Sequence, residues 1–213
     1  MNAVVDNDVL LKGACYGLLP TLIGTVTNND PVGILGASRF VVPTYIKRNQ
    51  LRGDPALAES HFESFLATSE VLEPSSGEQL IAASFEAAAQ QLALNLDVGE
   101  SQLVAILISR HLSWLLTGDK RAIVSIEKLV DVDARLEEVA GKIKCLERLV
   151  ADALGKGDDA QIGQAICGEP SVDKTLSICF GCHSSNADAA TALEGLDSYI
   201  RHLRKSAPRV LAT

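Results

Sequence analysis

Short apolar runs that end at an acidic residue and lead into a helix are the feature that most constrains the fold of this chain. The run AVV ends at Asp6 and leads into VLLKGACYGLL, and SWLLT is followed by Gly118 and Asp119 before KRAIVSIEKL. A further step is expected where FVV, residues 40–42, is closed by Pro43 before TYIKRNQL. Short apolar strands that alternate with helices are typical of a parallel sheet buried on both faces. Residues 1–130 therefore predict a three-layer α/β domain with a sheet of four or five strands.

The rest of the chain is predicted to be a second, all-helical part. Within the first part, SSGEQLIAASFEAAAQQLALNL is the clearest helix, since Ser75 and Glu78 have capping-box spacing. Residues 133–153 have helical periodicity after Asp133, GKGDD marks a turn, and helical spacing returns from Asn186. We therefore expect residues 131–213 to form a helical C-terminal extension.

Charge and cysteine content bound the function and the compartment. The formal net charge of −8 does not support general electrostatic attachment to nucleic acid or to an anionic membrane, so any RNA contact must use a local basic patch. Asp6 and Asp8 interrupt what would be the apolar core of a signal sequence, and no apolar run reaches the ~18 residues that span a bilayer. A cytoplasmic protein without a membrane segment is expected. Its five cysteines are then expected to be reduced thiols rather than disulfides.

Three acidic residues stand where parallel α/β folds place their sites. Asp6 follows the first strand, Glu100 lies at a helix start and Asp119 follows SWLLT, so all three can converge on one edge of the sheet. Clustered carboxylates repel one another unless a cation shares them, and hard oxygen ligands suit Mg²⁺ or Mn²⁺. This pattern favours metal-dependent phosphodiester chemistry. The alternative is that the three acids only cap or stabilise helix starts.

The motifs VVDNDVLLKG, LNLDVGESQLVAILIS and SWLLTGDKRA resemble, in this order, the first strand, the LDxGE helix and the LLTxDxR segment of PIN-domain proteins. The resemblance covers about residues 3–130 and implies a PIN-like fold. It also implies a Mg²⁺- or Mn²⁺-dependent ribonuclease, often a toxin held by an antitoxin. Asp6, Glu100 and Asp119 would be its catalytic and metal-binding residues.

The chain departs from the family pattern at two positions. Asn49 stands where the family usually has a glutamate, six residues after the proline, and an amide brings no negative charge to a metal. Gln102 stands where members with a GExE pattern have a second glutamate. Asp8, Glu59 or Glu63 are alternative sources of a further carboxylate.

If the site is catalytically active, it would hydrolyse RNA by in-line attack of a metal-bound water on phosphorus. Thr117, two residues before Asp119, is a candidate for hydrogen bonding to that water or to a phosphate oxygen, with an ordinary strand-end threonine as the alternative. No acid lies between Asp30 and Asp54, and the basic residues of this interval are candidate RNA contacts. They are Arg39, Lys47, Arg48 and Arg52. A solvated helix face explains the same residues without RNA.

The segment CFGCH contains Cys179, Cys182 and His183. It matches a haem c attachment sequence, which would need an exported protein, and with Cys167 it could hold zinc. Buried, reduced helical thiols without a metal are the favoured interpretation.

A second hypothesis for the function assumes the same fold with little or no catalytic activity. In it, the chain is a catalytically weak or inactive PIN-like module that binds a protein partner through its helical extension. Asn49 favours this hypothesis, whereas Asp6, Glu100 and Asp119 favour the nuclease. The apolar faces of the extension's helices would be buried on the core or on a second copy of the chain.

Overall fold

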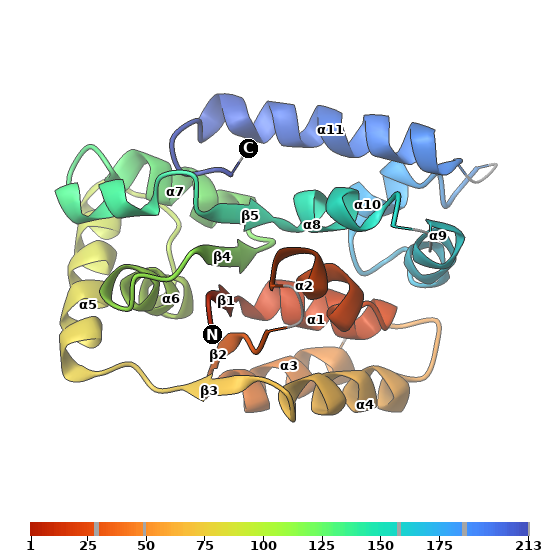
Figure 1. The fold of residues 1–213 in the computed structure, drawn as a ribbon, viewed down its shortest axis with the longest axis horizontal. Coiled ribbons are helices and arrows are strands. Elements are labelled where there is room, and N and C mark those ends of the chain that lie inside the picture. Colours follow the sequence, from red (N-terminus) through yellow and green to blue (C-terminus); the bar gives the residue numbers. More distant parts are fainter. Residues whose placement is uncertain (28–29, 49, 157–158, 185–186, 213) are drawn as a thin grey trace.

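The protein is built around a five-stranded, all-parallel sheet (Figure 1). The structure is a computed structural model that describes residues 1–27, 30–48, 50–156, 159–184 and 187–212. The strands are β1 (Ala3–Val5), β2 (Gly33–Leu35), β3 (Glu70–Leu72), β4 (Trp114–Thr117) and β5 (Ile143–Cys145). Their order across the sheet is β3-β2-β1-β4-β5, and every neighbouring pair is parallel. All five carboxyl ends therefore lie at one edge of the sheet.

Helices connect the strands and follow the last one. They are α1 (Asn7–Tyr16), α2 (Leu19–Thr27), α3 (Ser38–Arg48), α4 (Pro55–Leu66), α5 (Ser76–Gln91), α6 (Val98–Ser109), α7 (Lys120–Leu129), the 3₁₀ helix η1 (Ala134–Val139), α8 (Leu146–Ala153), α9 (Asp159–Gly168), α10 (Lys174–Cys179) and α11 (Ala189–Ser206). Figure 1 shows α5, α6 and α7 gathered on one side of the sheet and α1 to α4 on the other.

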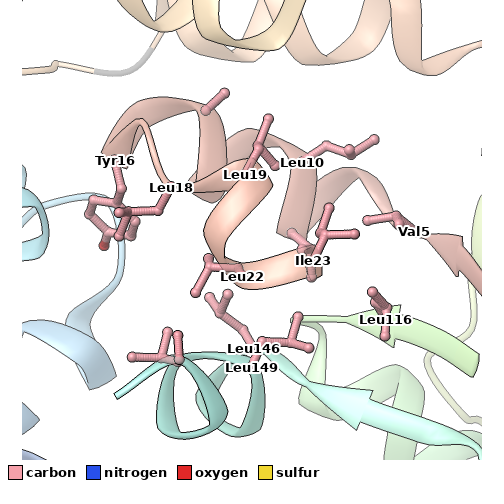
Figure 2. Packing of buried hydrophobic residues seen from close by; sticks show 14 of the residues in the cluster. Val5, Leu10, Tyr16, Leu18, Leu19, Leu22, Ile23, Leu116, Leu146 and Leu149 are labelled. Atoms are coloured by element: carbon pink, nitrogen blue, oxygen red, sulfur yellow. The ribbon is translucent and has the colours of Figure 1, made fainter. Parts of the chain in front are cut away.

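The sheet is buried on both faces, as the continuous apolar strands predict. Successive strand residues point to opposite faces. Val5 and Leu116 therefore pack with the helices α1 to α4 and α8, while Val4 and Leu115 pack with α5, α6 and α7. Figure 2 shows the first of these clusters, in which Leu22 of α2 lies against α8. The three-layer α/β architecture expected from the sequence is confirmed at this level.

Two of the predicted strands and the capped helix are confirmed by the structure. β1 and β4 lie in the runs AVV and SWLLT, and a complete capping box of Ser75 and Glu78 starts α5. The strand expected at FVV is wrong, because these residues lie within α3. Ser38, Val42 and Ile46 form the buried side of that helix at a spacing of four residues. The second strand is instead Gly33–Leu35, closer to the N-terminus.

The expectation of an all-helical extension is also wrong. Ile143–Cys145 form β5, which pairs in parallel with β4 and extends the same sheet. The long helix predicted over residues 133–153 is broken into η1, β5 and α8. The break follows Ala140, since Gly141 has a left-handed φ of 67° that ends the helical path.

The C-terminal residues return to the outer side of β5. Leu211 forms a parallel bridge with Ile143, whose N–H donates to the carbonyl of Val210. Arg209 fixes this return, because its Nε donates to Glu127 Oε1 at 2.6 Å while Glu127 Oε2 accepts from the Arg209 backbone. The tail thus covers the free edge of the last strand.

Cys167 of α9 and Cys182, just after α10, form a disulfide. The expectation of reduced thiols is therefore wrong for these two residues. The chain turns after α9 and passes through α10 before it reaches Cys182. This path brings the Cα atoms of Cys167 and Cys182, 15 positions apart in the sequence, to within 4.9 Å of each other. Cys179 is a buried free thiol, in agreement with the expectation for it.

Within the described ranges, no helix combines the length and the apolar character needed to cross a bilayer.

Candidate functional site

The site lies at the carboxyl edge of the sheet, where the strand order changes direction. The chain runs outward from β1 through β2 to β3, then returns to the other side of β1 and forms β4. Parallel α/β sheets bind ligands in the crevice at such a switch point, because the two outgoing connections diverge there. Here the switch point lies between the ends of β1 and β4. Asp6 directly follows β1, and Thr117 ends β4.

Asp6 is held at this position from both strands. Its backbone N–H donates to the carbonyl of Leu116, and its Oδ1 accepts from the Asn7 N–H at 2.7 Å as the N-cap of α1. Thr117 Oγ1 donates to Asp6 Oδ2 at 3.0 Å. The Asp6 side chain is buried, with 8% of its surface exposed. Thr117 therefore orients this carboxylate rather than serving as an ordinary strand-end residue.

Asp119 begins α7 and is tied to its first turn. Its Oδ1 accepts from the N–H of Arg121 at 2.7 Å, and its Oδ2 accepts from the Arg121 guanidinium at 2.9 Å. The N–H of Asp119 donates to Thr117 Oγ1, so one hydroxyl contacts both acids of the switch point. Asp119 thus acts as the helix cap that the alternative interpretation expected, while its side chain also lines the crevice.

Glu100 lies in the first turn of α6 and is engaged in a capping box with Asp97. The Glu100 N–H donates to Asp97 Oδ1 at 2.8 Å, and the Asp97 N–H donates to Glu100 Oε2 at 2.9 Å. Sequence reasoning had not assigned a role to Asp97. The spacing Asp97-x-x-Glu100 at a helix start is the signal that could have found it.

Asp8 lies one residue beyond Asn7, in the first turn of α1, and faces the start of α7. Its carboxylate pairs with Lys12 Nζ at 2.7 Å, and Lys12 also pairs with Asp173 at 2.8 Å. A Cβ at Gly118 would collide with the Asp8 carboxylate, so a larger residue there would displace this side chain. Lys12 was also missed by sequence reasoning, although its spacing of four residues from Asp8 on one helix face is a signal.

The acidic side chains of this region surround one cavity of about 620 Å³, the acidic cavity. Five acids line it, and one face of α3 closes it with Val41 and Tyr45. The acids are Asp6, Asp8, Asp97, Glu100 and Asp119. The three carboxylates predicted from the sequence therefore lie at the same edge of the sheet and around the same space.

Burial and like charge raise the pKa values of three of these acids, Asp6, Asp8 and Glu100. Burial and then the charge of Asp8 raise the pKa of Asp6 to about 6. Burial, followed by the charges of Asp97 and Asp6, raises the pKa of Glu100 to about 8. For Asp119, burial is outweighed by the hydrogen bonds from Arg121, and its pKa is lowered. Without a cation, the cavity is a place where negative charge is disfavoured.

The donor set can be compared with what a divalent cation needs. No three His, Cys, Asp or Glu side chains of the described residues are placed to hold one ion together, so the expected assembly of Asp6, Glu100 and Asp119 around a single metal is not seen. Mg²⁺, however, is commonly held by one or two carboxylates together with waters and substrate phosphates. Asn7 lines the same cavity, and its Oδ1 is buried without a hydrogen-bond partner among the described residues. The oxygen donors therefore fit Mg²⁺ or Mn²⁺ chemically.

The other predicted residues are placed as follows. Arg39, Lys47 and Arg48 are exposed on α3, and Lys47 pairs with Glu59 at 3.3 Å. Arg52 is exposed in the following loop. Gln102 lines the acidic cavity, whereas neither Glu59 nor Glu63 does. Asn49 lies outside the described residues.

The CFGCH group does not gather into one site. Cys182 is bonded to Cys167, and His183 Nε2 lies 3.3 Å from Ser177 Oγ. The thiol of Cys179 is buried, and Gly195 of α11 packs against it.

Comparison of the chain with known protein families, with curated proteins and with solved structures gave no match.

Proposed function

We propose that this protein is a metal-dependent endoribonuclease of PIN type that uses Mg²⁺ or Mn²⁺ in the acidic cavity. The proposal is carried by the convergence of five acids at the switch point between β1 and β4, beside an amide oxygen of Asn7 that has no hydrogen-bond partner among the described residues. Concentrating buried carboxylates raises their pKa and costs folding energy, which a bound divalent cation would offset. The PIN-like order of the three motifs around Asp6, Glu100 and Asp119 supports the same conclusion.

We expect Asp6 and Glu100 to hold the cation, because both line the acidic cavity and neither is paired with a basic side chain among the described residues. Asp8 and Asp119 are paired with Lys12 and Arg121. When bound, the cation would lower the pKa of a water and neutralise charge on the phosphate. Thr117 keeps the Asp6 carboxylate oriented through its hydroxyl, and Asp119 completes the acidic wall once Arg121 releases it.

The α3 wall of the cavity supplies the substrate contacts of this proposal. Tyr45 is 51% exposed at the cavity, and Phe40 of the same helix is 76% exposed. An exposed aromatic ring can stack on an unpaired base, and the neighbouring cations Arg39 and Arg48 can meet phosphates. This combination favours single-stranded or loop RNA. If the protein is a toxin, an antitoxin would be the protein partner.

The test is cleavage of a mixed RNA pool by the wild type and by Asp6→Asn, with Mn²⁺, with Mg²⁺ and with EDTA. We expect cleavage only by the wild type and only with metal, because removal of one charged ligand lowers metal occupancy. Asp30→Asn, an exposed acid outside the cavity, is the matched control and should cleave like the wild type. Cleavage that survives Asp6→Asn would refute the assignment of the site.

The inactive binding module is the second candidate, and one observation favours it. Arg121 holds the Asp119 carboxylate, so a cation must compete with an arginine for this acid. Titration of the wild type with Mn²⁺ separates the two proposals. No binding at millimolar Mn²⁺, together with no cleavage, would support the module.

A further inference from the structure

A second cavity, of about 410 Å³, lies between α7 and α11 and has the opposite charge to the acidic one. Its ionisable lining residues are basic, apart from the phenol of Tyr199, and no carboxylate lines it among the residues that the structure describes. The basic residues are Lys120, Arg121, Lys128 and His202. In a chain with a net charge of −8, a cavity lined in this way requires an explanation.

Helical spacing on two facing helices builds this cationic cavity. Lys120, Val124 and Lys128 lie on one face of α7, and Tyr199 and His202 lie on one face of α11. Figure 1 shows α11 running above β5 and α8, with its C-terminal end near α7, and α7 and α11 are in contact. Lys120 Nζ lies 5.8 Å from the centre of the Tyr199 ring, so an aromatic surface accompanies the positive charge.

The cations of this cavity are only partly neutralised. Lys120 pairs with Glu147 at 2.5 Å, and Arg121 pairs with Asp119. Within the described part of the chain, Lys128 is exposed and forms no ion pair. The site therefore keeps the positive charge that would attract an anion.

Arg121 connects the two cavities. Its side chain lines the cationic cavity, while its guanidinium donates to Asp119, which lines the acidic cavity. A guanidinium matches the geometry of a phosphate as well as that of a carboxylate. A phosphate bound beside Arg121 would compete with Asp119 for the guanidinium and leave the Asp119 carboxylate available to a cation.

We propose that the cationic cavity between α7 and α11 binds phosphate groups of the RNA strand whose scissile phosphate lies in the acidic cavity. The inference rests on the proposed function. In this proposal the RNA leaves the acidic cavity past Arg121 toward Lys128. The basic residues of α3 do not indicate this direction.

The test measures binding without cleavage. A fluorescently labelled 12-nucleotide single-stranded RNA is titrated with the full chain in EDTA over a series of salt concentrations. Lys128→Gln removes one phosphate contact, so the slope of log K against log salt should fall by about 0.7, and affinity at 0.1 M salt by about fivefold. Lys205→Gln is the matched control, because Lys205 is an exposed lysine of α11 outside the cavity. Equal slopes and affinities for Lys128→Gln and Lys205→Gln would overturn the proposal.

A second measurement uses only the wild type. RNA should protect the amine of Lys128 from acetylation, read by mass spectrometry, more strongly than it protects Lys205. Inorganic phosphate alone at the same phosphate concentration should protect Lys128 less than the strand does. Equal protection by free phosphate would mean a site for a small anion and would overturn the assignment to the strand.

The outcome is independent of the cleavage assay. Metal-dependent cleavage combined with no effect of Lys128→Gln would refute the phosphate site and leave the nuclease in place. Binding that depends on Lys128, without cleavage under any metal condition, would support the phosphate site and refute the nuclease.

Discussion

Asp6 should make the metal-free protein less stable as the pH rises. Burial and the nearby Asp8 raise its folded-state pKa from 3.8 to about 6, so the folded protein binds a proton that the unfolded chain has already released. The contribution of this proton to stability is complete below about pH 4. It is lost as the pH rises through about 6. Above pH 7 the folded state holds a buried, unneutralised carboxylate.

The size of the effect follows from the difference between the two pKa values. Each pKa unit corresponds to 1.36 kcal/mol, so Asp6 alone should lower the free energy of unfolding by about 3 kcal/mol between pH 4 and pH 8. Asp6→Asn removes the charge and keeps the shape. Its Oδ1 can still accept from Asn7, and its amide can donate to Thr117 Oγ1. The variant should therefore be more stable than the wild type by about 3 kcal/mol at pH 8 and equal to it near pH 4.

Urea unfolding followed by circular dichroism in EDTA, at intervals from pH 4 to pH 8, measures this difference. Asp30→Asn carries the same chemical change on an exposed acid and should follow the wild type at every pH. Adding Mn²⁺ at pH 8 should stabilise the wild type and not Asp6→Asn, since the cation binds the folded state through this carboxylate. An Asp6→Asn variant that is less stable than the wild type at pH 8 would refute the reasoning.

Three further predictions follow from the structure. Arg110→Met leaves the carboxylate of Glu78 without its partner and should lower the free energy of unfolding at pH 7 by about 1 to 3 kcal/mol. Because the pKa of Glu78 is lowered to about 2, this loss should shrink as the pH falls from 6 to 3, and a constant loss would contradict the ion pair. Replacing Cys167 and Cys182 with serine should cost about 3 kcal/mol for a loop of this length, and an unchanged urea midpoint under oxidising conditions would contradict the bond. Tyr45→Ala should weaken RNA binding in an anisotropy titration by about 1 to 3 kcal/mol per stacked base, and unchanged affinity would exclude stacking.

The sequence predicted strands correctly where a short apolar run is followed by an acidic residue that starts the next helix. AVV and SWLLT are short apolar runs closed by acids, and both form strands. FVV was predicted to be a strand because valine favours strands. It lies instead within α3, whose buried residues Ser38, Val42 and Ile46 are spaced four apart, as on one face of a helix. β5 was missed for the opposite reason. Val139, Ile143 and Leu146 happen to have helical spacing, and a strand of three residues is too short to show its own period.

Four of the five acids of the site could be predicted, because each stands just after a strand or in the first turn of a helix; they are Asp6, Asp8, Glu100 and Asp119. Their partners could not all be predicted in this way. The hydrogen bond between Thr117 and Asp6 joins residues 111 positions apart, and the cationic cavity combines helices that are far apart in the chain. The disulfide depends on the path of the turn between α9 and α10, which no spacing rule gives. Positions fixed by tertiary packing are therefore those that sequence reasoning missed.

The tail that returns along β5 changes how this sheet can meet other chains. A free strand edge offers unpaired N–H and C=O groups to any neighbouring peptide. At β5 the backbone of Ile143 is already bonded to Val210 and Ala212, so that edge is closed by the chain itself. Among the strands that the structure describes, β3 is the other border, and it ends the sheet beside β2 alone. A partner protein that joined the sheet by adding a strand would have to approach along Glu70–Leu72, and not along the C-terminal side of the molecule.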